Sequence, residues 1–119
     1  MRALGPVGVA ALLLALPAGV GNAATPSRLM VSGDEYSLVL SRQSIARGPA
    51  LVQFVNRGED SHDLKMKRIE GGPELRFAEV GSNRLTERTV NLNSGRYRLW
   101  CSLPGHARKG MRATLSVRR

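Results

Sequence analysis

Short apolar runs alternate with turn-forming segments along most of the chain. From residue 28 onward, runs rich in Val and Leu are separated by Gly, Asn, Pro and Ser. This spacing is typical of an all-β sandwich or barrel. The pattern predicts seven strands, at residues 28–32, 35–41, 50–56, 62–69, 84–92, 95–101 and 111–117. Residues 70–83 interrupt it. We expect a long connection there, with at most a helical turn over 73–80, because Pro73 suits a helix start.

Two of the expected strands alternate cleanly between apolar and polar positions. A period of two places alternate side chains on opposite faces of a strand. The two apolar faces consist of His62, Leu64 and Met66, and of Tyr97, Leu99 and Cys101. His62 and Cys101 therefore lie at strand ends on core-facing positions, where two strands of one sandwich could bring them together.

The first 23 residues have the layout of a secretory signal peptide. Arg2 supplies a positive charge, residues 7–16 are apolar, and Gly21 and Ala23 are small residues at a cleavage site. We expect a signal peptide at 1–23 and one domain at 24–119, exported to the periplasm or the extracellular space. A retained N-terminal anchor is the alternative, although the apolar run is short for a membrane span.

The chain is strongly basic. It has 18 Lys and Arg against 9 Asp and Glu, a formal net charge of +9. Removing residues 1–23 takes away only Arg2 and leaves +8. The charge favours acidic partners or anionic surfaces, including peripheral association with a membrane. We expect no nucleic-acid partner, because export and sparse aromatic residues argue against one. An arginine-rich surface without a specific partner remains the alternative. We expect a monomer.

The only cysteine lies in an unusual group of potential metal ligands. Cys101, His106 and Met111 follow one another with four residues between each pair, and His62 is the only other histidine. Each of these residues taken singly is more often structural. Together, two imidazoles, one thiolate and one thioether are the set that binds copper as a His2Cys centre with a weak axial Met. The sequence therefore predicts one copper ion, cycling between Cu(I) and Cu(II).

The segment between the ligands is suited to a metal loop. Pro104 and Gly105 predict a tight turn that reverses the chain after Cys101. Gly110 gives backbone freedom just before Met111. A short, restrained loop loses little entropy when a metal orders it.

These segments resemble those of the cupredoxins, the blue copper proteins that include plastocyanin and azurin. The resemblance covers residues 28–118 and rests on the Tyr97–Cys101 run, the Cys-x4-His-x4-Met spacing, and the Asn56-Arg-Gly58 turn before His62. It implies a Greek-key β-sandwich and a type 1 copper site made of His62, Cys101, His106 and Met111. It also implies that an edge of His106 reaches the surface in an apolar patch.

One residue departs from the cupredoxin pattern. The position after the first copper histidine is usually asparagine, which helps to tie the two ligand loops together, and here it is Asp63. A carboxylate can still accept a backbone N–H near Ser102, although it donates nothing unless it is protonated. We therefore expect the tie between the loops to persist in altered form.

The expected function is one-electron transfer between redox partners, without catalysis. Both histidines are used by the site, and four ligands leave no open position for a substrate. Arg108, Lys109 and Arg112 form a basic ring that would steer an acidic redox protein, and Trp100 is either a second partner contact or ordinary packing. The alternatives are a copper carrier for homeostasis and an accessory cupredoxin-like domain without electron transfer.

Overall fold

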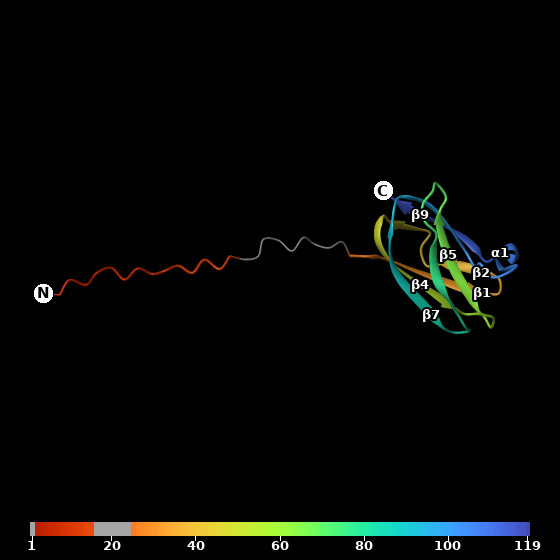
Figure 1. Cartoon of the computed structure of the whole chain (residues 1–119), viewed down its shortest axis with the longest axis horizontal. Coiled ribbons are helices and arrows are strands. Elements are labelled where there is room, and N and C mark those ends of the chain that lie inside the picture. The colour runs from red at the N-terminus through yellow and green to blue at the C-terminus, as the bar shows by residue number, and fades with distance from the viewer. Residues whose placement is uncertain (1, 16–24) are drawn as a thin grey trace.

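A computed structural model describes residues 2–15 and 25–119. The domain consists of two β-sheets that pack face to face (Figure 1). The four-stranded sheet has the order β2-β1-β4-β7. Its strands are β1 (Ser27–Asp34), β2 (Ser37–Leu40), β4 (Gly48–Asn56) and β7 (Leu85–Leu92).

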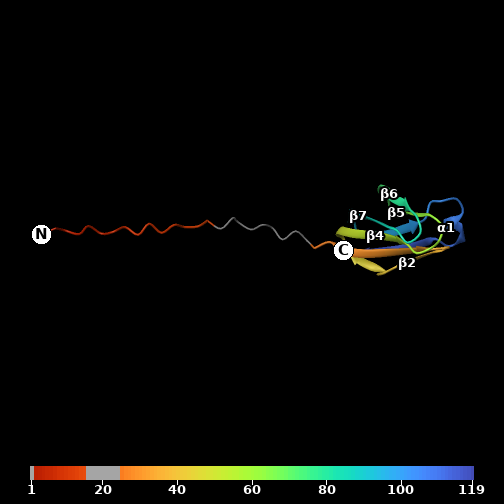
Figure 2. The same ribbon diagram turned by 90° about the horizontal axis from the view of Figure 1, so that it is seen from below.

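The five-stranded sheet has the order β3-β9-β8-β5-β6. Its strands are β3 (Ser44–Ala46), β5 (His62–Arg68), β6 (Leu75–Val80), β8 (Gly95–Trp100) and β9 (Arg112–Arg118). The single helical turn α1 (His106–Lys109) connects β8 to β9. It lies at the end of the sandwich opposite the C-terminus, as both views show (Figure 2).

Strands that are distant in the sequence lie next to one another. β1 pairs with β4 in parallel, β4 pairs with β7, and β8 lies between β5 and β9. Because the chain crosses repeatedly between the sheets, few neighbours are joined by simple hairpins, as in a Greek key. The expected all-β sandwich is confirmed.

The core lies between the inner faces of the two sheets. The burial pattern of β5 alternates as its sequence predicts, and His62, Leu64 and Met66 are all fully buried. On β8, Tyr97 and Leu99 point inward, and the Tyr97 hydroxyl donates to the Asn93 carbonyl at 3.2 Å. Each large apolar side chain buried in this way contributes about 1.5–3 kcal/mol. The core therefore holds both ligand-bearing strands firmly in place.

The described residues contain nine strands rather than seven, and the prediction for 70–83 was wrong. β6 (Leu75–Val80) lies in the middle of that segment and pairs with β5 along the sheet edge. The register shifts between His62 and Leu64, so that Val80 lies opposite His62 and Phe77 opposite Leu64. This bulge breaks the period of two, because it adds a residue to one strand of the pair. β3 escaped prediction because only Ile45 of its three residues is buried.

The predicted signal peptide is described only in part, over residues 2–15. Residues 2–15 form neither helix nor strand, and the expected cleavage site falls outside the described residues. No helix in the described ranges is long and apolar enough to cross a membrane.

Candidate metal centre

A buried asparagine organises the turn that leads into His62. Asn56 ends β4, and its Nδ2 donates to the carbonyls of Asp60 at 2.7 Å and Val80 at 2.9 Å. Its Oδ1 accepts the backbone N–H of Gly58 at 2.9 Å. Because all of the polar atoms of this buried amide are bonded, it fixes the turn rather than weakening the core. The turn delivers His62 to the inner face at the start of β5.

A carboxylate holds the far side of the His62 ring. Nε2 of His62 lies 2.9 Å from Oε1 of Glu35. Glu35 also accepts the backbone N–H groups of Asp60 at 2.8 Å and Glu59 at 3.1 Å. These bonds, that of Asp60 first, lower the pKa of the Glu35 carboxyl from 4.5 to about 2. An ionised carboxylate only accepts, so Nε2 of His62 donates to Glu35, and Nδ1 is the ring nitrogen that faces the cluster.

Cys101 follows the last residue of β8 and is fully buried. Its backbone N–H donates to the carbonyl of Met111 at 3.1 Å, which joins the two ends of the loop. Burial raises the pKa of the Cys101 thiol. A bound cation is therefore needed to stabilise the thiolate at neutral pH, because a metal ligand must lose its proton.

The loop between Cys101 and Met111 closes with two glycines in left-handed conformations. Gly105 has φ 77° and Gly110 has φ 128°, on either side of α1. A Cβ on Gly110 would also lie 2.7 Å from the carbonyl oxygen of Tyr36. Only glycine meets both demands without strain. The expected turn at residues 104–105 is confirmed, and one helical turn follows it and carries His106.

Three of the four predicted ligands converge. Nδ1 of His62 lies 3.1 Å from Nδ1 of His106, and Sγ of Cys101 lies 4.0 Å and 3.6 Å from these two nitrogens. The three distances form a triangle, and the point equidistant from its corners lies about 2.1 Å from each atom. This is within the ~2.0–2.3 Å at which nitrogen and sulfur bind a metal. The donor set and its geometry both fit a single metal ion.

Met111 is fully buried at the other end of the same loop. Its backbone N–H donates to the carbonyl of His106 at 3.1 Å, and its carbonyl accepts the N–H of Cys101. A Cβ on Gly33 would lie 2.9 Å from Cε2 of Phe54 and 3.4 Å from Cε of Met111, so the end of the thioether side chain lies beside Gly33 and the Phe54 ring. Met111 is thus tied by its backbone to two residues of the cluster, and its role as a ligand remains a prediction.

Solvent reaches the cluster from one side. His62 and Cys101 are fully buried, whereas His106 is partly exposed. The Tyr36 ring packs edge-on against His106, with 5.0 Å between the centroids. The expectation that His106 has an edge at the surface is consistent with this exposure.

Asp63 ties the two ligand-bearing segments together. Its Oδ1 accepts the backbone N–H of Ser102 at 2.6 Å, and its Oδ2 accepts the Ser102 hydroxyl. Asp63, which follows His62, thus accepts both hydrogen bonds from Ser102, which follows Cys101. The predicted tie near Ser102 is confirmed, with both of its donors on the loop.

Removing this tie should destabilise the fold. Asp63→Ala leaves the partly buried N–H and hydroxyl of Ser102 without their charged acceptor, which costs about 1.5–3 kcal/mol. We expect the free energy of unfolding in urea to fall by that amount. Asp63→Asn keeps an acceptor oxygen and should recover most of the loss. An Ala variant as stable as the natural protein would show that the tie contributes nothing.

Sequence patterns missed two residues that shape the centre. Glu35 and Tyr36 lie in the connection between β1 and β2, far from the ligands in sequence. No spacing relates them to His62 or His106, because only the packing of β1 against the loops brings them together. A lone acidic residue after a strand carries no signal of this contact.

The basic residues near His106 divide into two groups. Nζ of Lys109 lies over the Tyr36 ring, 4.5 Å from its centroid. Arg108 and Arg112 instead line a hollow together with Trp100. Trp100 is partly exposed. The steering of an acidic partner by these basic residues remains a prediction.

Solved structures with similar folds include a "blue" copper protein and a purple cupredoxin. No family model and no curated protein matches the chain. Auracyanin B is 20% identical, with a TM-score of 0.64, over 82% of this chain and 93% of its own. Auracyanin A, a "blue" copper protein from the green thermophilic photosynthetic bacterium Chloroflexus aurantiacus, is 16% identical, with a TM-score of 0.62, over 79% and 100%. A purple cupredoxin from Nitrosopumilus maritimus is 16% identical, with a TM-score of 0.54, over 77% and 99%.

These likenesses establish the fold. The domain is a β-sandwich of the cupredoxin type, as the sequence resemblance implied. Within that fold, His62, Cys101 and His106 form a cluster able to hold one metal ion.

Proposed function

We propose that the chain is an exported protein that binds one copper ion in a type 1 site and transfers single electrons between redox partners. The observation that carries the proposal is the convergence of two imidazole nitrogens and one cysteine sulfur around a common point. Met111 completes the proposed ligand set as the axial thioether. The similarity to auracyanin A, whose description names it a blue copper protein, supports the choice of metal.

The chemistry of the donors favours copper in two oxidation states. Soft thiolate and thioether ligands can hold Cu(I), and imidazole binds either state, so copper would supply a reversible one-electron couple. The surrounding residues hold the donors still. Glu35 fixes the tautomer of His62, and Asp63 restrains the loop after Cys101. Such outer contacts fix ligand orientation and tune a metal site.

The number of ligands favours electron transfer over catalysis. The chain has two histidines, and both lie in the cluster. With Met111 as the fourth ligand, no position is left for a substrate. The partly exposed His106 gives electrons a short route between the buried cluster and the surface.

The location and the partner are further parts of the proposal. The sequence of residues 1–23 supports cleavage of a signal peptide and a mature domain at 24–119, in the periplasm or outside the cell. The positive charge supports an acidic redox protein as partner. Mass spectrometry of the exported protein tests the first point, since an uncleaved N-terminus would leave the anchor alternative.

Copper loading separates electron transfer from copper trafficking. Adding Cu(II) to the purified protein should give an intense thiolate-to-copper charge-transfer colour that disappears on one-electron reduction and returns on oxidation. Colourless Cu(I) binding that a chelator readily reverses would instead indicate a carrier for homeostasis. Met66 is fully buried in the core and Met30 lies on the surface. We interpret both as structural residues rather than as extra soft ligands in support of that alternative.

The role of Met111 can be tested by its apolar counterpart. Met111→Leu should keep copper bound and raise the reduction potential, because loss of the axial thioether weakens the hold on Cu(II). Protein-film voltammetry measures the shift, and Met66→Leu is the matched control in the same core. An unchanged colour and potential in Met111→Leu would make Met111 a core residue rather than a ligand.

A further inference from the structure

The outer face of the five-stranded sheet carries a group of cations around the only tryptophan. Lys67 on β5 is opposite Arg98 on β8, and Trp100 on β8 is opposite Arg112 on β9. Arg108 on α1 borders the same surface. We call these five residues the Trp100 face.

The charges of the Trp100 face are uncompensated. Among the described residues, ion pairs engage the neighbouring Lys65 and Arg68, with Glu74 and Glu70, but none engages a cation of this face. The sequence has no acidic residue after Glu87. Like charges directly opposite each other on neighbouring strands destabilise a sheet. The two like-charged side chains of Lys67 and Arg98 therefore do not stabilise the sheet by facing each other.

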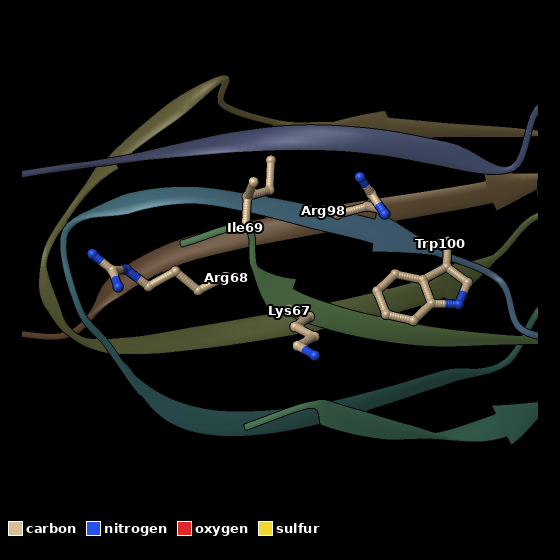
Figure 3. Close-up of a pocket in the computed structure, with 5 residues that line it drawn as sticks. All are labelled: Lys67, Arg68, Ile69, Arg98 and Trp100. Carbon is tan, nitrogen blue, oxygen red and sulfur yellow. The ribbon is translucent and has the colours of Figure 1, made fainter. Parts of the chain in front are cut away.

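The Trp100 face is hollowed rather than flat. Arg98 and Trp100 line two adjoining hollows, one of about 190 Å³ that Lys67 also lines and one of about 550 Å³ that Arg108 and Arg112 also line. Figure 3 shows Lys67, Arg98 and Trp100 around the first of these hollows. Side chains of a partner could enter both. Arginine and tryptophan are also the residue types that most often dominate binding energy at interfaces.

The hollows continue to the metal loop. Trp100 and Arg108 also line a third hollow together with Cys101 and the loop that follows it. A molecule seated on Trp100 would therefore contact the segment that holds the candidate ligands. A redox protein would gain from this position, because it would lie beside the cluster.

We propose that the Trp100 face docks an acidic protein surface with clustered carboxylates. Arginine binds carboxylates with two parallel hydrogen bonds, and the exposed indole supplies an apolar anchor between the cations. Lys109 is not counted in this surface, because its Nζ lies over the Tyr36 ring. The identity of the partner as a redox protein rests on the proposed function, whereas binding of acidic groups does not.

A peptide of ten glutamates with a fluorescein label tests the proposal by anisotropy at low ionic strength. The natural full-length chain should bind it, and added salt should weaken binding, because exposed charges are screened. Arg98→Gln/Arg112→Gln should weaken binding about tenfold, as expected for losing two exposed charge contacts. Neither side chain makes a hydrogen bond or ion pair among the described residues, and a thermal melt checks that the variant folds.

The matched control is Arg42→Gln/Arg47→Gln, which removes the same net charge from exposed positions near β3. The affinity of this control variant for the peptide should stay within about twofold of that of the natural protein. Since Trp100 is the only tryptophan, its emission should also shift when the peptide binds. Equal losses in both double variants, or binding to phosphatidylglycerol vesicles without binding to the peptide, would overturn the proposal.

The two proposals fail separately. Peptide binding is measured with and without copper, and the visible spectrum of the copper-loaded protein is recorded for each variant. If the chain bound no copper, the electron-transfer proposal would fall while the peptide result stood. If Arg98→Gln/Arg112→Gln kept both its colour and its full peptide affinity, only the docking surface would be rejected.

Discussion

We expect Cys101→Ala to abolish the blue colour that the proposed site predicts for the copper-loaded protein. The intense band of a type 1 site arises from charge transfer between the cysteine thiolate and Cu(II), and Cys101 is the only thiol in the chain. Sγ of Cys101 lies 3.6 Å from Nδ1 of His106 and 4.0 Å from Nδ1 of His62. Since the chain has no other thiol, no second thiolate can replace it at this corner of the cluster. Visible absorption of the Cu(II) form measures the loss.

Two further variants make this result specific. Cys101→Ser keeps the size of the side chain but provides no thiolate, so it should be as colourless as the Ala variant. Met30→Leu removes an exposed sulfur on the four-stranded sheet and should leave the band unchanged. A blue Cys101→Ala protein would exclude the thiolate–copper bond.

We expect copper to raise the melting temperature of the protein by a large amount. A ligand that binds only the folded state stabilises it by about 4 kcal/mol when present at a thousand times its dissociation constant. In a domain of about 95 residues, each kcal/mol raises Tm by about 4–8 °C, which predicts a rise of about 15 °C or more. Differential scanning calorimetry with and without stoichiometric copper measures it.

The rise depends on the intact cluster. His106→Ala removes one imidazole from a partly exposed position, so the variant should fold but gain much less stability from copper. Copper stabilises the fold because the donors come together only in the folded chain. The unfolded chain therefore offers no comparable site. An equal rise in His106→Ala and the natural protein would place copper elsewhere on the chain.

Periodicity predicted the strands that carry the ligands. Buried residues at alternate positions, as in His62, Leu64 and Met66, leave a clear period of two in the sequence. The edge strand β6 does not, because its bulge places Phe77 and Val80 three residues apart opposite β5. The segment also opens with Gly71, Gly72 and Pro73, which resemble a connection.

The grouping of His62, Cys101 and His106 could be predicted from the sequence, whereas the residues that support the cluster could be predicted only in part. Cys101, His106 and Met111 lie close together in sequence, and His62 is the only remaining histidine, so chemistry alone singled them out. The tie through Asp63 followed from its place beside His62. Glu35 reaches His62 across 27 residues through the packing of the β1–β2 connection, and no local pattern records such a contact.

Copper K-edge X-ray absorption of the loaded protein tests the central claim most directly. If His62, Cys101 and His106 hold the metal, the spectrum should show two nitrogens and one sulfur within about 2.3 Å of a single copper ion. Cys101→Ala should lose the sulfur and keep the nitrogens. A copper ion surrounded only by nitrogen and oxygen in the natural protein would contradict the site.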